Sequence, residues 1–534
     1  MTYFKLVFFG AFLPVTMILY QLMVKKYRWV ILLLSSLVFF LTFGRKVIVY
    51  LILAAGITYG IGRLLESIDA KSKQLVKDLK KSDASSEEIR AEKSKIKSKY
   101  KRRGRAALVL GIIAVLSMLL YLKYYNFFIE NINALLSGEH FALRNLVMPI
   151  GISFYSMQAI GYMADVYWGK VKAEKNPFKM LLFLSFFPTL MEGPIAPYVE
   201  IKDALYAGES IVPENIIRGY IRLFWGILKK LVIADRLFPA VNVLFDTGTE
   251  RKGLEIVAAT VLFTVMEYMD FSGCMDMVLG FGTVFGVTLP ENFRQPFFAR
   301  NASEFWRRWH ISLGVWFKTY IFYPVSMSGL VKKWNKFAKD RCGKHLTRVV
   351  ASSFALLPVW ISNGLWHGPK WTYIFYGVFY FVMIMLELIF EPVGDAILAK
   401  LKLTKENKVV DVIRILRTWI VIFMGELFFR ADTLKDGFKM FANMWKGGSL
   451  GVITEKGFLS WGVDAADWIV ILISLLVVIV VNVLKERGVD VMSRLLAKPM
   501  PVRLAVSFTL VVVLIIFGLY GPGYQEVDLI YAGF

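Results

Sequence analysis

Residues 371–390 read WTYIFYGVFYFVMIMLELIF, an apolar stretch in which Glu387 is the single charged side chain. A helix needs about 20 apolar residues to cross a hydrocarbon core about 30 Å thick. Comparable apolar runs recur along the chain, at residues 28–44, 47–65, 106–122, 464–484 and 503–521. The sequence therefore predicts an all-α, polytopic helical membrane protein.

The composition of the whole chain agrees with this class. Of its 534 residues, 57% are hydrophobic and 15% aromatic, with a mean hydropathy of +0.54. Soluble domains are about 45–50% apolar by a comparable count. No soluble stretch of useful size interrupts the apolar runs, so we expect one membrane-embedded unit over residues 1–534, with roughly 10–12 spans. The first apolar run lacks the basic start and the cleavage site of a signal peptide, and we interpret it as a retained span.

The charge distribution predicts the orientation in a cell membrane. The formal net charge is +23, and the basic residues lie mainly between apolar runs, where they mark the cytoplasmic side and predict no nucleic-acid partner. Residues 69–105 hold 14 Lys and Arg against 6 Asp and Glu, a net charge of +8. We expect this basic insertion to be a cytoplasmic helical hairpin, and contact with membrane lipid or with a cytoplasmic acyl carrier remains open. By the same rule, both termini and residues 446–463 are predicted to be extracytoplasmic.

The middle of the chain, residues 147–330, does not divide into simple spans. Prolines interrupt its apolar runs, at positions 149, 188, 194, 197, 290, 296 and 324. Interrupted backbone at membrane depth is tolerated only where protein or a water-filled cavity surrounds it. We therefore expect re-entrant or broken helices around a central tunnel, and a site within that tunnel.

Two short motifs indicate the chemistry. They read WRRWH at residues 306–310 and GLWHG at residues 364–368, and they contain two of the four histidines of the chain. Imidazole gains and loses a proton near neutral pH, and an ionisable group inside a membrane is costly enough to predict a functional site. The alternatives are an interfacial aromatic anchor for the first motif and a structural histidine at a helix end for the second.

The local sequence predicts how each histidine is presented. Asn301 is the expected N-cap of a helix over about 302–320, with Glu304 three residues later and in position to pair with Arg308. Such a helix would place Arg307, His310, Gly314 and Phe317 on one face. Pro369 ends the helix before it, so His367 is expected at the helix end or in the turn. Two acids at membrane depth, Asp270 and Glu192, could orient a histidine or pair with an arginine.

The motifs together resemble the membrane-bound O-acyltransferase family. The stretch from residues 290–294 through 304–313 resembles its central signature, and further matches occur in the family's order at residues 149–154, 187–195, 233–235, 270–273, 364–368 and 428–431. The resemblance covers residues 150–430, which we interpret as the catalytic core. Within the family, the chain is similar to bacterial alginate O-acetyltransferase membrane subunits and to D-alanyl-teichoic acid transfer proteins. The ending at residues 528–534 departs from the usual tail of the alginate-type members.

The resemblance implies an enzyme, an O-acyltransferase. It would move an acyl group, expected to be acetyl, from a cytoplasmic thioester across the membrane to hydroxyls of a cell-surface polysaccharide. The expected donor is acetyl-CoA or an acyl-carrier-protein thioester, with no tightly bound cofactor and no metal. An exported acyl-transfer partner protein is also implied. The residues carried over are His367 and His310 as the catalytic pair, Arg307, Arg308, Trp306, Trp309, Trp366 and Asn363 as substrate-binding side chains, and Asp270 and Glu192 as supporting acids.

Other functions remain open on the sequence alone. D-alanyl transfer to teichoic acid would use both histidine motifs. A polysaccharide or lipid transporter would share the polytopic core, although no inverted repeat is visible. A non-catalytic membrane scaffold for a secreted transferase would not depend on its histidines.

Overall fold

The computed structural model describes residues 2–3, 5, 7–83, 85–447, 457–521, 524 and 527. Every regular element in this part of the chain is a helix, which confirms the predicted class. Residues 448–456, which are half of the expected outer loop at 446–463, and the whole tail at 528–534 lie outside the described residues.

Six helical segments are long and apolar enough to cross a membrane. They are Ile48–Leu79, Ser86–Leu135, Lys344–His367, Trp371–Lys400, Ala465–Glu486 and Met500–Phe517. The expected 10–12 spans would also require the shorter or more polar helices of the middle region, so that number stays a prediction. The multi-pass character of the protein is established by these six segments.

The chain divides into two compact units. The first unit comprises Met1–Ile216 and Gly282–Leu289. Its helices, with the short 3₁₀ and π segments labelled η, are η1 (Phe8–Phe12), α1 (Leu13–Leu22), η2 (Lys25–Tyr27), α2 (Arg28–Leu41), α3 (Ile48–Leu79), α4 (Ser86–Leu119), η3 (Leu120–Tyr124), α5 (Tyr125–Leu135), α6 (Ile152–Tyr167), α7 (Pro177–Ser185), α8 (Phe187–Leu190) and α9 (Tyr198–Ala207).

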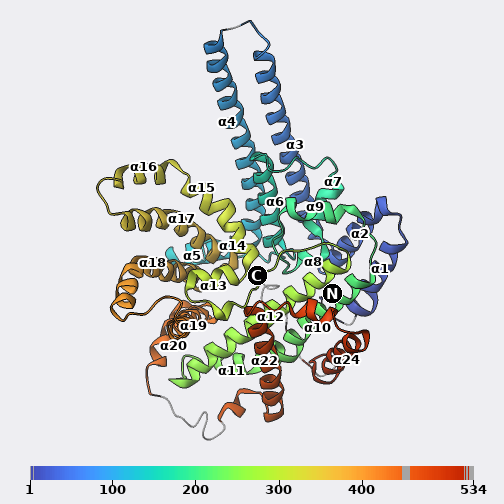
Figure 1. Ribbon diagram of the computed structural model, residues 1–534, viewed down its shortest axis with the longest axis vertical. Coiled ribbons are helices and arrows are strands. Elements are labelled where there is room, and N and C mark those ends of the chain that lie inside the picture. Colours follow the sequence, from blue (N-terminus) through green and yellow to red (C-terminus); the bar gives the residue numbers. More distant parts are fainter. Residues whose placement is uncertain are drawn as a thin grey trace. The chain divides into compact units, whose positions relative to one another are not determined.

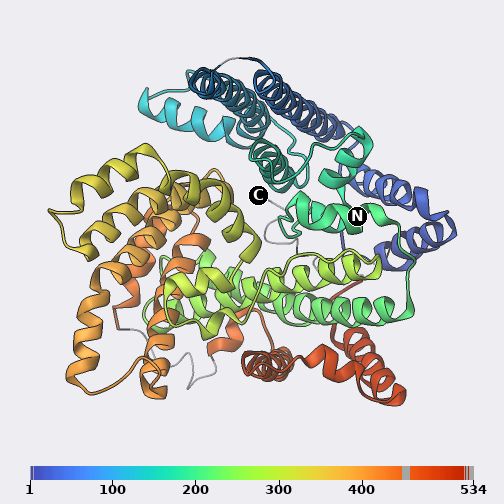
Figure 2. The ribbon, with the colours of Figure 1, turned by 45° about the horizontal axis from the view of Figure 1, so that its top comes forward.

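The basic insertion forms a helical hairpin from the ends of α3 and α4, which run side by side beyond α6 in both ribbon views (Figures 1 and 2). Helix α4 begins with a capping box, in which the Ser85 hydroxyl accepts from the Glu88 backbone and the Glu88 carboxylate accepts from the Ser85 backbone. The Ser85 hydroxyl also donates to the Glu88 carboxylate at 2.8 Å. This bond, together with the one from the Ser85 backbone N–H, favours the charged form and holds the pKa of Glu88 below its ordinary value. The cytoplasmic location of the hairpin stays a prediction.

The second unit comprises Ile217–Phe281 and Pro290–Phe534. Helices α10 and α12 each run from one unit into the other. The elements of the second unit are α10 (Pro213–Ile227), η4 (Leu228–Ala234), α11 (Asp235–Asp246), α12 (Leu254–Val284), η5 (Pro296–Phe298), α13 (Ala302–Arg308), α14 (Ile311–Phe317), η6 (Lys318–Phe322), α15 (Tyr323–Ser326), α16 (Gly329–Ala338), α17 (Lys344–His367), α18 (Trp371–Lys400), α19 (Lys408–Arg430), α20 (Leu434–Met444), η7 (Gly457–Trp461), α22 (Ala465–Glu486), α23 (Val491–Leu496) and α24 (Met500–Phe517).

The middle of the chain is built largely from short or interrupted helices, as its prolines predict. Helix α7 ends at Ser185 and α8 starts at Phe187, with Pro188 in its first turn. A seven-residue π segment, η4, interrupts the run from α10 to α11. Helix α12 is the exception, because it continues for 31 residues. These interruptions change the direction of side chains that a continuous helix would place on one face.

Helices α17 and α18 cross at unusually close range, and two glycines make this possible. A Cβ atom on Gly364 would lie 2.5 Å from the carbonyl oxygen of Tyr373, and one on Gly377 would lie 2.2 Å from that of Trp360. Both distances are shorter than real Cβ contacts. The paired glycines therefore let the two backbones touch, one turn before α17 ends at His367.

Candidate active site

His367 is the last residue of α17, as the following Gly368 and Pro369 predict. The 24 residues of this helix span about 36 Å, enough to cross the hydrocarbon core. His367 therefore lies at the end of the span opposite to the basic end at Lys344 and Arg348. The side chain is only 2% exposed, although it borders the turn between two spans.

Aromatic rings surround the imidazole of His367. Its ring centroid lies 5.1 Å from that of Trp366, 5.0 Å from Phe429 and 5.7 Å from Tyr376, and all three pairs are edge-to-face. The Tyr373 ring is 6.2 Å away. Such a wall excludes water from the space next to the imidazole and lowers the local dielectric, which strengthens electrostatic interactions there.

His310 lies in a turn between two short helices, and the prediction of one helix over 302–320 is wrong. Helix α13 ends at Arg308 and α14 starts at Ile311, while His310 adopts the left-handed conformation with φ of +45°. A non-glycine residue in this region costs free energy and persists only where its surroundings impose it. The start of the helix is as predicted, because the Asn301 side chain accepts from the Glu304 backbone.

Asn292 imposes this turn, and sequence reasoning did not select it. The backbone oxygen of Asn292 accepts from the Ile311 N–H at 3.0 Å, and its side-chain oxygen accepts from the Ser312 N–H at 2.8 Å. The side-chain nitrogen of Asn292 donates to the sulfur of Met275 on α12. Asn292 is fully buried. The first two backbone N–H groups of α14 therefore bond to Asn292 instead of to carbonyl oxygens of the preceding turn. As a result, the chain leaves helical geometry at His310. Asn292 lies in the PENFR stretch at residues 290–294, which is part of the family resemblance. That stretch alone does not show which groups Asn292 bonds to.

Trp366 joins the two histidines. Its ring contacts His310 at 5.4 Å between centroids, and it contacts the adjacent His367 at 5.1 Å. His310 also packs against Phe271 of α12 at 4.8 Å. The two motifs, 57 positions apart in sequence at their histidines, therefore meet around one indole ring.

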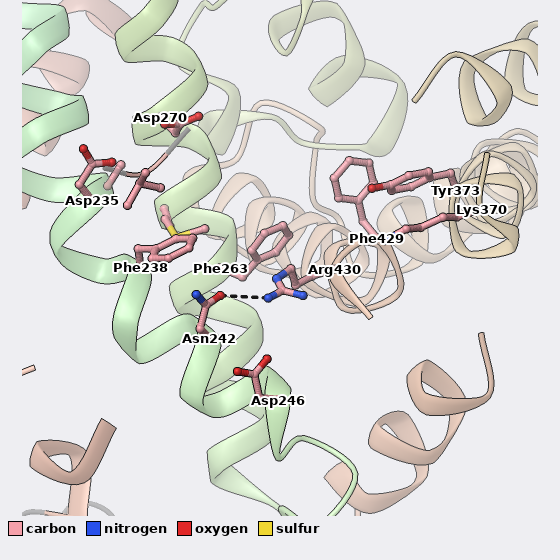
Figure 3. Close-up of a pocket in the computed structure, with 13 residues that line it drawn as sticks. Asp235, Phe238, Asn242, Asp246, Phe263, Asp270, Lys370, Tyr373, Phe429 and Arg430 are labelled. Carbon is pink, nitrogen blue, oxygen red and sulfur yellow. Dashed lines mark hydrogen bonds between the residues drawn. The ribbon is translucent and has the colours of Figure 1, made fainter. Parts of the chain in front are cut away.

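A pocket of about 440 Å³ adjoins the wall around His367 (Figure 3). Two of the rings that contact His367, Tyr373 and Phe429, also line this pocket. Side chains of α11 and α12 form another part of the lining, and Arg430 donates to the side-chain oxygen of Asn242 at 3.0 Å within it. The full lining is Ala234, Asp235, Phe238, Asn242, Asp246, Phe263, Met266, Asp270, Lys370, Tyr373, Phe429, Arg430 and Val527.

Two of the acids that line the pocket, Asp235 and Asp270, are paired with a buried lysine. Lys230, which has no exposed surface, forms ion pairs of 2.7 Å with both Asp235 and Asp270. Asp270, predicted as a supporting acid, is therefore held by a lysine and lines the pocket next to the rings around His367. Lys370 and Arg430 contribute positive charge to the same lining. A pocket with aromatic, cationic and amide side chains suits a polar organic group such as a sugar.

The predicted tryptophans occupy different places. Trp366 lies between the histidines, whereas Trp306 packs against Trp360 and Tyr380, at 5.0 and 4.9 Å between centroids. Trp309 is buried against Tyr268, Phe293, Phe297 and Phe305. Trp306 and Trp309 therefore support the helices that carry the histidines, and their predicted contact with substrate stays a prediction.

The two predicted arginines also differ. Arg308 pairs with Glu304 at 2.8 Å, as expected, and makes a two-pronged contact with Glu486 of α22. Its guanidinium thus links α13 to α22. Arg307 is exposed, and no carboxylate in the described part of the chain lies within ion-pair distance of it. Arg307 is therefore the arginine that is available to an incoming anionic group.

Two other predicted residues, Asn363 and Glu192, are buried. Asn363 is buried one turn before His367, and its side-chain oxygen accepts no hydrogen bond within the described residues. Glu192 is fully buried in the loop between α8 and α9 and belongs to the first compact unit. The structure also shows a buried acid that the sequence did not single out. Glu426 of α19 accepts from the Tyr376 hydroxyl at 3.0 Å and is hydrogen-bonded to Glu267 of α12.

No group of three or more His, Cys, Asp or Glu side chains in the described residues is placed to hold a metal ion.

Comparisons with known proteins agree with the motifs. Residues 174–338 match the model of MBOAT, the membrane-bound O-acyltransferase family. The chain is 28% identical over 449 residues to the probable alginate O-acetylase AlgI of Pseudomonas aeruginosa, covering 83% of this chain and 74% of that protein. It is 29% identical over 370 residues to the peptidoglycan O-acetyltransferase of Helicobacter pylori, 64% of each chain. It is 27% identical over 288 residues to the teichoic acid D-alanyltransferase of Bacillus subtilis, covering 54% of this chain and 69% of that protein.

The helical membrane fold, the two Trp-His motifs and these similarities define an enzyme class, the acyltransferases that act from within a membrane. The chain is an O-acyltransferase, and its residues 174–338 form an MBOAT family domain, as the resemblance of its motifs predicted.

Proposed function

We propose that this enzyme transfers an acyl group, expected to be acetyl, from a cytoplasmic thioester to a hydroxyl of a cell-surface polysaccharide. The observation that carries the proposal is the meeting of His310 and His367 on Trp366, with the rings around His367 forming a wall of the 440 Å³ pocket. The relatives supply the acceptor class, because those named above are described as acting on alginate, peptidoglycan and teichoic acid.

In this proposal the acceptor hydroxyl enters the pocket and approaches His367. The imidazole takes the hydroxyl proton as the oxygen attacks the thioester carbonyl, so that a C–O bond forms and the C–S bond breaks. The proton then passes to the departing thiolate, which leaves as a thiol. General-base assistance of this kind is typically worth about 10²–10⁴-fold in rate. No added oxidant, reductant or metal is needed for the balance.

The donor is proposed to approach from the side of His310. Arg307 is exposed and free of carboxylate contact in the described chain, and a guanidinium binds the phosphates of a coenzyme or carrier arm through charge-assisted hydrogen bonds. Acetyl-CoA and an acyl-carrier-protein thioester both bring such phosphates. A tunnel through the protein would let the thioester reach the imidazoles while the carrier stays on the cytoplasmic side.

The test compares His367→Ala with His345→Ala, expressed at equal level in a strain that lacks the native gene. His345 is half-buried, and in the described part of the chain its ring is hydrogen-bonded to the backbone oxygen of Ile389 alone, so it serves as the control histidine. The content of polymer-bound ester should fall by about 10²–10⁴-fold in the His367 variant and stay at the parental level in the control. Normal ester content with His367→Ala would overturn the assignment. Mass analysis of the released acid distinguishes acetate from D-alanine, which is the alternative favoured by the Bacillus subtilis relative.

The final acceptor can be the polymer itself or an exported acyl-transfer partner that passes the group on. We favour the partner, because the alginate-type proteins that this chain resembles are expected to work with one. Purified protein with a thioester donor should then acylate a defined glycan poorly until that partner is added. Efficient acylation of the glycan by the purified protein alone would show direct transfer instead.

A further inference from the structure

The basic hairpin carries a charge distribution that the acyl transfer reaction does not explain. Residues 69–92, which form the α3 side and the tip, hold six Lys and Arg and six Asp and Glu, and are neutral overall. Residues 93–105 of α4 hold eight Lys and Arg and no acid. The whole net charge of +8 is therefore confined to 13 residues of one helix.

These cations are exposed and almost unpaired. Seven of the eight side chains are exposed and Lys93 is half-buried. In the described chain, the only carboxylate within ion-pair distance of any of them is Glu92, 3.4 Å from Lys95. Lys93, Lys97, Lys101 and Arg105 follow one another at i,i+4 spacing, where like charges repel and destabilise a helix. A bound polyanion would relieve this repulsion.

The position of the cluster identifies that polyanion. Helix α4 continues without a break from Arg105 into the uncharged residues 106–119, part of a candidate span. Leu110 and Ile113 in this stretch are 64% and 57% exposed, as expected for side chains that face lipid. At 1.5 Å per residue, the cluster covers about the first 18 Å beyond the hydrocarbon. The headgroup layer takes up about 5–7 Å of that distance, and the Debye length adds about 8 Å.

We propose that residues 93–105 form a binding surface for the phosphate headgroups of anionic lipids in the adjoining leaflet. The charge lies where the headgroups are and is missing from the tip of the hairpin, which is the part that a soluble acidic protein would meet first. A Lys or Arg close to an anionic membrane surface contributes about fivefold to the binding equilibrium. Lipid binding would hold the base of the hairpin at the membrane surface whether or not the enzyme is turning over.

The experiment uses the full chain in nanodiscs, with Cys274 and Cys342 replaced by serine and a donor fluorophore on Ser98→Cys, an exposed position within the cluster. Energy transfer is measured to trace headgroup-labelled phosphatidylglycerol and, separately, to phosphatidylcholine with the same label. The parent should show phosphatidylglycerol enriched several-fold near the fluorophore, and raising the salt concentration should reduce the enrichment.

Two variants with the same change of charge separate position from total charge. K93Q/K97Q/K101Q/R105Q removes four cations from the cluster and should abolish the preference for phosphatidylglycerol. K77Q/K80Q/K81Q/R90Q removes four exposed cations nearer the tip and should retain most of it. K93R/K97R/K101R should bind as the parent does, and circular dichroism verifies that each variant is folded.

Equal energy transfer to both lipids in the parent, or equal losses in the two glutamine variants, would overturn the proposal. So would binding of an acidic polypeptide such as polyglutamate through these cations in the absence of any preference for phosphatidylglycerol, because the surface would then serve a protein. None of these readings depends on catalysis.

Discussion

At the scale of single residues, Asn292 decides the presentation of His310. The four histidines of the chain are visible in the sequence, but the left-handed turn at His310 depends on two bonds to Asn292. This residue precedes the two donors, Ile311 and Ser312, by 19 and 20 positions. The Asn292 side chain holds the Ser312 N–H, and its backbone holds the Ile311 N–H. Asn292 is therefore a positioning residue, which acts through the imidazole.

Replacing Asn292 with Ala should lower both stability and activity. The buried Ser312 N–H would lose its acceptor, at a cost of about 1–3 kcal/mol, and a displaced His310 should lower acyl transfer by about 100-fold. Thermal unfolding and ester content measure the two effects. Asn335→Ala is the control, because this exposed residue of α16 makes no side-chain hydrogen bond among the described residues. Parental activity in Asn292→Ala would show that the turn forms without this side chain.

At the scale of the elements, the crossing of α17 and α18 positions His367. Gly364 belongs to the GLWHG motif, and in the structure the backbone of α18 lies against it at Tyr373. The second glycine of the crossing, Gly377, lies inside the apolar run at 371–390. Nothing in the sequence of that run indicates that it contacts another helix. The same helix pair brings Tyr373 and Tyr376 against the imidazole.

Gly364→Ala should separate the two helices and displace His367. Its Cβ would lie 2.5 Å from the Tyr373 carbonyl oxygen, and overpacking of this kind costs about 1–3 kcal/mol. Gly394→Ala, on α18, provides the comparison, because no atom lies within 4 Å of its Cβ position and Ala favours helix by about 0.5–1 kcal/mol. We expect a lower unfolding temperature and reduced ester content for the first variant only. Equal behaviour of the two would refute the close crossing.

At the scale of the whole molecule, the prediction concerns topology. The basic hairpin is expected in the cytoplasm and the neutral segment before α22 outside. In a background without Cys274 and Cys342, a cysteine at Ser86 should resist an impermeant thiol reagent in intact cells, while one at Ser460 should react. Both positions are exposed, so accessibility to the reagent reports the side of the membrane. Both should react after the cells are opened, and the reverse pattern in intact cells would invert the orientation assigned to the two histidines.

The sequence by itself determined the class of fold, the two histidines and the resemblance to the membrane-bound O-acyltransferases. Apolar runs long enough to span a bilayer depend on composition over about 20 neighbouring residues. Each Trp-His motif is a short contiguous stretch of sequence. Both features can therefore be recognised without the tertiary structure. The cap at Asn301, the pair of Glu304 with Arg308 and the helix end at His367 were predictable for the same reason, since each involves residues within four positions of one another.

Only the tertiary structure decided which groups share the site. The turn at His310, the indole of Trp366 between the histidines, the pocket beside Tyr373 and Phe429, and the engagement of Arg308 by Glu486 all join residues far apart in sequence. Helix periodicity predicted His310 in the middle of a continuous helix, because the competing acceptor at Asn292 is invisible to it. Local sequence fixes which backbone geometry is favoured, whereas buried hydrogen bonds and close helix packing between distant segments decide which geometry is formed.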